Sequence, residues 1–396
     1  MPNERDLPHW RRLDARNPEE LEAARVLARR IADLDPRYSI EHERFWFREP
    51  DAMRIYACEK DGAAVGLALL VGSRTSLPLR LGEVTIGGIP VERQSLSGCP
   101  LFDPSVGPLE APLTRQLLTR LAKDLPRDGV GFAWGARADT PLYELLVAHS
   151  ERLPFRVVGY GEIYHRRLID LPARYEDYLA GLGAKTREDL RRNERRLGEA
   201  TKNTLRIEVY DSIEKIPAFL DAATVVSQKS YQWQLLRLGL RDRDAQVARF
   251  SNAARQGWLR CYVLFGNDTP LAFMVGFLFG GTYSSEDIAY DPDWQKFSVG
   301  NVLHCRVIRD LIALGGRAQR FDFMYGDNTN KERLSTTARL EGNFYLFPRT
   351  VRGLFTYSII EAVNRSSELA GRTLQRLGTK SAIRKRLRQW ARKRVV

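Results

Sequence analysis

The sequence predicts a mixed α+β protein of two tandem units, each with a mixed, mostly antiparallel sheet flanked by helices, followed by a basic C-terminal helix. Three observations support this class. Runs rich in β-branched and aromatic residues alternate with amphipathic helical patterns in both halves. The order hairpin, helix, strand, helix occurs twice along the chain, as expected for two copies of one plan. Finally, residues 381–396 contain basic side chains and no acidic ones.

The first half opens with a predicted β-hairpin. Two β-rich runs, 53–58 and 63–71, are joined by Asp61-Gly62, a strong turn signal. Leucines at helical spacing then predict a helix, and Thr140 with Pro141 has the pattern of a helix start. The remaining elements expected here are a helix at 113–125, a strand at 129–134, a helix at 140–150 and a strand pair within 155–171.

The second half repeats this order. Its predicted hairpin turns at Gly266-Asn267-Asp268, residues that favour tight turns. The other elements expected are helices at 185–200, 213–229 and 244–256, a helix at 301–316, and strands at 205–210, 282–290, 319–327 and 342–348. We place the boundaries so that the units span 1–165 and 166–352, with a basic helical tail at 353–396.

Composition excludes several classes of protein. The chain has 396 residues, 43% hydrophobic and 28% charged, and no apolar run of the length that a membrane span needs. Its first residues lack the apolar segment of a secretory signal, so we expect a cytoplasmic protein. The four cysteines lack C-x-x-C spacing and only five histidines accompany them, so neither a disulfide framework nor a metal site is expected.

Positive charge is concentrated at the C-terminus. Of the net charge of +13, seven positive groups lie in 381–396, which leaves +6 for the other residues. Ile383, Leu387 and Trp390 share one face if this segment is helical. A cationic amphipathic helix suits an anionic membrane surface, so peripheral attachment at the inner membrane is one expectation. Binding of nucleic acid such as tRNA and a disordered solubilising tail are the alternatives.

The turn before the helix at 300 has the features of an anion site. A helix N-terminus presents unpaired N–H groups and a partial positive charge, which favour phosphate oxygens. Gly300 supplies a position without a side chain where backbone must approach a pyrophosphate. The residues we assign to this site are Gln295, Lys296, Phe297, Ser298, Val299, Gly300 and Asn301.

The pattern Gln295-x-x-Ser298-x-Gly300 resembles the acyl-CoA-binding signature of GCN5-related N-acetyltransferases (GNAT), in which Gln or Arg is followed at fixed spacing by Gly and then Gly or Ala. The longer run 289–335 contains Tyr-Asp-Pro, this turn, a helix and Phe-Asp-Phe-x-x-Gly-Asp. It is similar to the subfamily associated with bacterial cellulose and exopolysaccharide biosynthesis. That subfamily is distantly similar to Fem-type aminoacyl transferases. Two positions depart from the pattern: Ser298 replaces the first Gly, and Asn330 replaces an aromatic residue before Lys331.

The resemblance, which covers about 175–350, implies two GNAT-like units of which the first is degenerate. The second would be an N- or O-acyltransferase that uses acyl-CoA, with acetyl-CoA as the expected donor and no metal. The acceptor would be a small molecule: a sugar, an amino sugar or an envelope or exopolysaccharide precursor. The alternatives are a Fem-type transferase that uses aminoacyl-tRNA and a non-catalytic scaffold of a polysaccharide synthase complex.

Four carboxylates are candidates for the general base. Asp322 lies between two phenylalanines, where burial would raise the pKa of its carboxyl unless it is paired. Asp327 follows at the exit of the same strand, and we expect these two ahead of Glu286 and Asp287, which lie on the strand before the turn. The alternative for Asp322 is a structural ion pair with the basic helix at 185–196.

Further roles follow from what direct acyl transfer requires. Lys331 is the candidate for stabilising a developing oxyanion, with an ordinary surface lysine as the alternative. Tyr325 would protonate the leaving thiolate, with Tyr290 and Tyr345 as alternatives. The basic helix near 185–200 is either a solvated helix stabilised by i,i+4 pairs or a lid over the phosphates of CoA or an acidic acceptor.

Overall fold

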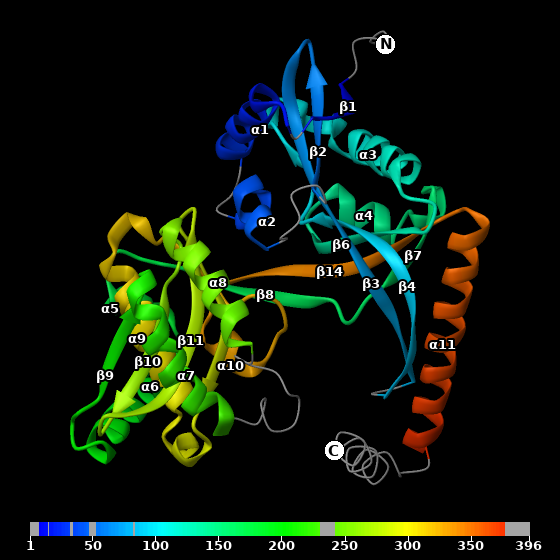
Figure 1. Cartoon of the computed structure of the whole chain (residues 1–396). Helices are drawn as coiled ribbons and strands as arrows, with labels where there is room; N and C mark the ends of the chain where they lie inside the picture. The colour runs from blue at the N-terminus through cyan, green and yellow to red at the C-terminus, as the bar shows by residue number, and fades with distance from the viewer. Residues whose placement is uncertain are drawn as a thin grey trace. The chain divides into compact units, whose positions relative to one another are not determined.

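A computed structural model describes residues 8–14, 16–31, 35–46, 53–81, 84–229 and 242–376. The chain divides into two compact units (Figure 1). Unit 1 comprises Met1–Ala32, Arg37–Ile163 and Glu341–Val396, and unit 2 comprises Asp33–Pro36 and Tyr164–Leu340. Each unit has its own hydrophobic interior.

Unit 1 is a mostly antiparallel sheet in the order β1-β2-β3-β4-β6-β14, with β5 paired to β3 and β7 paired to β14. Strands β4 and β6 are parallel. The strands are β1 (His9–Arg12), β2 (Met53–Lys60), β3 (Ala63–Leu81), β4 (Val84–Ser97), β5 (Leu101–Phe102), β6 (Gly129–Arg137), β7 (Phe155–Gly159) and β14 (Thr337–Pro348). The helices are α1 (Pro18–Ile31), α2 (Ile40–Trp46), α3 (Glu110–Asp124), α4 (Pro141–Val147) and α11 (Val351–Arg376), with short 3₁₀ turns η2 (Pro36–Tyr38), η4 (Pro104–Leu109) and η5 (Ser150–Arg152).

Unit 2 has the strand order β8-β13-β12-β11-β10-β9, again mostly antiparallel, with β12 and β13 parallel. The strands are β8 (Tyr164–Asp170), β9 (Arg206–Tyr210), β10 (Cys261–Gly266), β11 (Thr269–Phe279), β12 (Thr282–Tyr290) and β13 (Arg320–Asp322). The helices are α5 (Tyr175–Gly181), α6 (Ala184–Ala200), α7 (Ile216–Lys229), α8 (Arg243–Arg255), α9 (Val299–Ala313) and α10 (Thr329–Leu334), with 3₁₀ turns η6 (Ile213–Lys215), η8 (Pro292–Phe297) and η9 (Gly315–Arg317).

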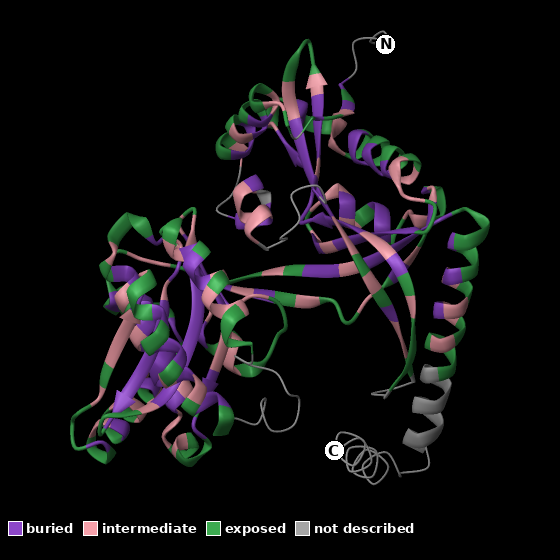
Figure 2. Cartoon of the chain, viewed as in Figure 1, coloured by how far each residue is buried: buried purple, intermediate pink, exposed green. Residues whose placement is uncertain are grey.

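Local chemistry explains the central elements of unit 2. The β10–β11 hairpin turns through Asn267 and Asp268, both with positive φ (52° and 58°), a conformation that these two residue types tolerate well. Both strands are buried along most of their length (Figure 2). Helix α9 buries an apolar stripe that includes Val302, Leu303 and Ile308 in the core of the unit.

The units repeat one plan at the level of single hydrogen bonds. Asp103 of unit 1 and Asp291 of unit 2 each precede a proline that begins a 3₁₀ turn, and each carboxylate caps that turn. The backbone N–H of Asp103 donates to Val65 O, and that of Asp291 donates to Leu271 O, both at 2.8 Å. Because Val65 and Leu271 occupy the same place in their hairpins, the two halves correspond residue by residue here.

The unit division differs from the expected boundaries in several places. The first break, between 163 and 164, lies two residues from the predicted boundary at 165. Residues 341–352, expected in the second unit, instead lie in unit 1, because β14 pairs with β6 and β7. The strands predicted as a pair within 155–171 are not paired with each other, since β7 pairs with β14 and β8 with β13.

The predicted tail helix begins inside unit 1. Helix α11 buries Ile360 in a core cluster of that unit together with Phe347. Residues 381–396, on which the amphipathic prediction rests, lie outside the described residues. Within the described part of the chain, no helix has both the length and the apolarity to cross a membrane.

Candidate active site

The sheet of unit 2 splits where β12 leaves β13. The two strands pair in parallel from Thr282 opposite Arg320 to Ser284 opposite Asp322. Beyond Ser284, β12 continues to Tyr290 with no ladder partner on that side among the described residues. An unpaired strand edge offers N–H and C=O groups to an extended ligand. The split therefore creates a place where a linear chain could bind along β12.

The turn after β12 leads directly into a helix N-terminus. Ser298 ends η8 and caps α9 in the left-handed conformation, with φ of 53°. Its carbonyl accepts from the N–H groups of Asn301 and Val302. The N–H groups of Val299 and Gly300 have no acceptor within the described ranges. The fold thus brings all seven predicted cofactor-binding residues, Gln295–Asn301, into η8 and the first turn of α9.

The fold itself does not require glycine at position 300. A Cβ placed there would meet the Tyr290 ring at 3.5 Å, an ordinary van der Waals distance. The space left by the missing side chain is therefore available to a ligand. This agrees with the sequence expectation that Gly300 permits close approach of a ligand.

Cations flank this turn from two elements. Lys296 lies over the Phe297 ring, 5.1 Å from its centroid, and Arg196 of α6 lies over the same ring at 5.8 Å. Both side chains are exposed. Helix α6 thus contributes a positive charge beside the turn, which supports the interpretation of α6 as a helix that faces phosphate groups.

A β-bulge on β12 carries two carboxylates. Asp287 pairs with Val275 and Ser285 with Gly276, so Glu286 is the extra residue. Burial raises the pKa of both the Glu286 and the Asp287 carboxyl, and the Arg249 guanidinium opposes the rise. Arg249 of α8 forms an ion pair with Glu286. Carboxylates whose pKa is raised toward neutrality are suited to accept a proton.

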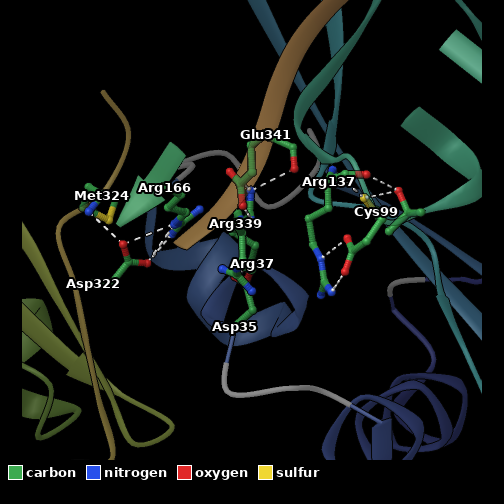
Figure 3. A network of polar contacts seen from close by, with 12 residues as sticks. Asp35, Arg37, Cys99, Arg137, Arg166, Asp322, Met324, Arg339 and Glu341 are labelled. Carbon is green, nitrogen blue, oxygen red and sulfur yellow. Dashed lines mark hydrogen bonds and ion pairs between the residues drawn. The ribbon is translucent and has the colours of Figure 1, made fainter. Parts of the chain in front are cut away.

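Asp322 is held in a buried ion pair. Arg166 of β8 donates to it through Nε (2.9 Å to Oδ2) and Nη2 (2.5 Å to Oδ2), and the N–H of Met324 donates to Oδ1 at 2.7 Å (Figure 3). Its partner is thus β8 and not the basic helix α6. Protonation of Asp322 would break this pair, so the geometry makes it a poor general base.

Asp327 is held in an ion pair, and the three candidate tyrosines lie in different surroundings. Two hydrogen bonds from the Arg167 guanidinium, both 3.0 Å, lower the pKa of Asp327. Tyr325 is 62% exposed on the loop after β13. Of the alternatives, Tyr290 is partly exposed beside Gly300, and Tyr345 lies in a core cluster of unit 1.

Lys331 stabilises the loop that follows β13 through hydrogen bonds to its backbone. Its ammonium donates to the carbonyl oxygens of Phe323 (2.8 Å), Tyr325 (3.0 Å) and Gly326 (3.0 Å). Burial lowers the pKa of this side chain. An ammonium has three N–H groups, and here each has a backbone acceptor. The arrangement favours a structural role over either role expected from the sequence, oxyanion stabiliser or surface lysine.

Three residues of this region were not singled out from the sequence: Arg166, Arg249 and His304. His304 is buried beside Phe321 and Phe323, and its Nδ1 lies 2.8 Å from Gly300 O. Burial lowers the pKa of this imidazole to about 4, so the ring is neutral at pH 7 and Nδ1–H donates to the carbonyl. His304 follows Gly300 by four residues, about one helical turn, and this spacing is the sequence pattern from which the contact could have been predicted.

Among the residues described, no three His, Cys, Asp or Glu side chains gather in the way that a metal ion requires.

Residues 184–332 match the family model of the Acetyltransferase (GNAT) domain. Unit 2 therefore contains a GNAT acyltransferase domain.

Several solved structures are similar in fold to this chain. FemX is 12% identical over 74% of this chain and 87% of its own, with a TM-score of 0.50. The C-terminal domain of a proposed lysylphosphatidylglycerol synthetase from Agrobacterium fabrum is also 12% identical, over 86% of this chain and 94% of its own, with a TM-score of 0.47. A tandem GNAT protein from the clavulanic acid biosynthesis pathway is 12% identical over 85% and 98%, with a TM-score of 0.45. No curated protein matches the chain in sequence.

Proposed function

We propose that unit 2 transfers an acyl group from acyl-CoA, with acetyl-CoA as the expected donor, to an amine or hydroxyl group of a small acceptor. One relationship carries the proposal. Strand β12 bears the bulge carboxylates, separates from β13, and leads into the helix whose first N–H groups are unpaired. A donor with a pyrophosphate at one end and a thioester at the other needs these features on neighbouring stretches of chain.

The donor would be held by the turn and by the edge of β12. The N–H groups of Val299 and Gly300 would receive pyrophosphate oxygens, and Lys296 and Arg196 would add charge. The pantetheine chain would lie along the part of β12 that β13 leaves unpaired. Bound there, the thioester supplies the activated carbonyl that the acceptor attacks.

Asp287 and Glu286 are the residues that we propose as proton acceptors. Both lie at the bulge, where burial raises the pKa of each carboxyl. Arg249 orients Glu286 and favours its charged form, which leaves Asp287 as the less restrained of the two. The ion pairs of Asp322 and Asp327 favour the order that places Asp287 and Glu286 first, the reverse of the expectation from sequence.

The two units differ in the features that donor binding needs. In unit 1 the equivalent parallel strands, β4 and β6, stay paired up to Ser97 opposite Trp134. They therefore separate farther along the sheet than β12 and β13 do in unit 2. Its helix α3 begins with Glu110 and has Pro112 in its first turn, which adds a negative charge and removes a donor. These differences support a single donor site, in unit 2.

For the acceptor we propose a sugar, amino sugar or envelope or exopolysaccharide precursor, on the basis of the resemblance of residues 289–335 to the exopolysaccharide-associated subfamily. We also propose that the basic segment 381–396 attaches the protein to an anionic membrane, where such precursors are found. This rests on composition, seven basic groups and no acidic one.

Titration calorimetry with CoA tests the proposed donor site. Gly300→Val should abolish binding, because the side chain would occupy the approach to the turn while its Cβ fits against Tyr290. The matched control is Ala111→Val at the second residue of α3, the corresponding position of unit 1, which should leave CoA affinity within about twofold. Unchanged affinity in Gly300→Val would place the donor elsewhere. Co-purified tRNA in place of CoA would favour the Fem-type alternative.

A further inference from the structure

One face of the unit 1 sheet carries serines among aromatic rings. Directly paired residues and residues two apart on a strand share a face. The register pairs Ser73 with Arg93, Ser95 with Phe132, and Ser97 with Trp134. Tyr345 pairs with Phe132 from the other side. We call this set the serine–aromatic face: Ser73, Arg93, Ser95, Ser97, Phe132, Trp134, Tyr160 and Tyr345.

The aromatic rings of this face form a contiguous cluster. Tyr345 packs on Phe132 with ring centroids 4.8 Å apart, and Tyr160 lies 5.1 Å from Tyr345 and 5.9 Å from Phe132. The Arg93 guanidinium lies 5.1 Å above the Phe132 ring. Phe132 and Tyr345 are buried in the core cluster that Ile360 of α11 joins, whereas Trp134, Tyr160 and Arg93 are half-buried. These last three side chains bring the cluster to the surface of the unit.

Several polar atoms of this face have no partner. Ser97 is only 2% exposed, and its Oγ makes no hydrogen bond to any residue that the structure describes. The same holds, within those ranges, for Ser73 Oγ and for the buried Nε of Arg93. Buried polar atoms are rarely left unsatisfied, because desolvation is unfavourable without a replacement bond. These three atoms are therefore the places on this face where a bound group would gain hydrogen bonds.

The internal repeat places this face at the counterpart of the active site. In unit 1, Leu70 pairs with Leu96, and in unit 2, Gly276 pairs with Ser285. Ser97 therefore corresponds to Glu286, the first bulge carboxylate. Unit 1 retains this face but has a serine where unit 2 has a carboxylate.

We infer that the serine–aromatic face is a non-catalytic binding site for a carbohydrate that carries a negative charge. Sugar rings present C–H groups that pack on aromatic faces, and their hydroxyls exchange hydrogen bonds with serines. Arg93 supplies a fixed cation for a carboxylate or phosphate substituent. The inference rests on the unit 1 geometry, and it holds whether or not unit 2 transfers acyl groups.

The first test is calorimetry on the full chain with a trigalacturonate probe. We expect saturable binding that is at least about tenfold weaker in Arg93→Gln, because the charge partner is lost. The matched control is Arg74→Gln, an exposed arginine on the opposite face of β3, which should bind within about twofold of wild type. A neutral trigalactose and inorganic phosphate are run in parallel. Equal affinity for neutral and charged sugar, or no saturation by about 10 mM of either, overturns the inference. Saturation by phosphate alone would reduce the site to an anion site and also overturn it.

A second variant separates binding from folding. Ser97→Ala removes a buried hydroxyl without a partner, so the free protein should melt about 2–4 °C higher while trigalacturonate binding weakens. A hydroxyl that mattered only for structure would give the opposite change in melting temperature. Because neither readout involves CoA or turnover, failure here is distinct from failure of the proposed acyl transfer.

Discussion

Asp322 and Arg166 form a buried ion pair between the adjacent strands β13 and β8, with 2.5 Å between Arg166 Nη2 and Asp322 Oδ2. The Asp322 side chain is 2% exposed and the Arg166 side chain 6%. The pair lies at the last residue before β12 and β13 separate. It therefore fixes the end of β13, where the proposed donor site opens.

The first prediction concerns this pair. Asp322→Asn should lower the free energy of unfolding by about 3–5 kcal/mol, because it leaves the buried Arg166 charge without its partner. Asp327→Asn is the control, since its pair with Arg167 is more exposed, and it should lose less than about 1 kcal/mol. Urea unfolding of both variants measures the difference. If Asp322→Asn is as stable as wild type yet inactive, Asp322 is a proton acceptor after all.

The second prediction uses the raised pKa of Asp287. A carboxyl whose pKa is raised by folding stabilises the protein below its unfolded pKa and loses that contribution as pH rises through the folded value. The ionised form is thus unfavourable at pH 7. Asp287→Asn should raise the melting temperature at pH 7 and give no gain near pH 3, below the usual Asp pKa of about 3.9.

The same variant should be catalytically impaired. Loss of a positioned base typically lowers turnover by about 10²–10⁴. In the wild type, turnover should fall as pH decreases through the raised pKa, because the base must be deprotonated. A variant that is stabilised at pH 7 and fully active would show that Asp287 is buried for another reason, and Glu286→Gln would then be the next candidate.

The third prediction concerns Lys331. Lys331→Met should destabilise the loop 323–326, since three carbonyl oxygens lose their donor, and the loss should be about 1.5–3 kcal/mol. Hydrogen exchange of this loop should become faster. Lys296→Met, an exposed lysine beside the turn, should leave exchange in the loop unchanged and weaken CoA binding instead. A Lys331 variant with normal exchange but strongly reduced turnover would restore the oxyanion role.

Local patterns predicted much of unit 2. The turn at Asn267-Asp268, the strand at 282–290 and the helix start near Gly300 all depend on neighbours in sequence, so the residues themselves indicate them. The ion-pair partners of the candidate acids, by contrast, do not lie near them in sequence, so local patterns do not identify them. Arg166 is 156 positions from Asp322, and no periodicity relates the two. The return of β14 to unit 1 is likewise set by pairing with β6, a long-range contact that a linear pattern does not carry.

The same distinction between local and long-range contacts applies to the site residues. Gln295–Asn301 lie together because they are consecutive, whereas the order among the four carboxylates depends on which cation each one meets. The sequence predicted a buried Asp322 next to two phenylalanines, and Asp322 is buried, but burial alone does not determine whether a carboxylate is free or paired. Arg249 and Arg166 decide that question, and both come from distant elements.

The last prediction concerns the basic segment 381–396, which lies outside the described residues and whose role is inferred from composition. Seven basic groups at about 1 kcal/mol each near an anionic surface could hold the protein at a membrane, with Leu387 and Trp390 adding apolar contact. Screening limits this attraction to about 8 Å at physiological salt, so binding should require anionic lipid and weaken as salt is added.

Vesicle sedimentation of the full chain and of a chain ending at Thr379 checks this expectation. The truncation removes all seven basic groups of the segment and leaves every residue of α11 in place. We expect the full chain to sediment with vesicles that contain phosphatidylglycerol at low salt, and the truncated chain to remain in the supernatant. Neutral phosphatidylcholine vesicles should retain neither. If both chains sediment equally with anionic vesicles, the attraction comes from elsewhere on the protein, and binding of the segment to nucleic acid becomes the next interpretation to test.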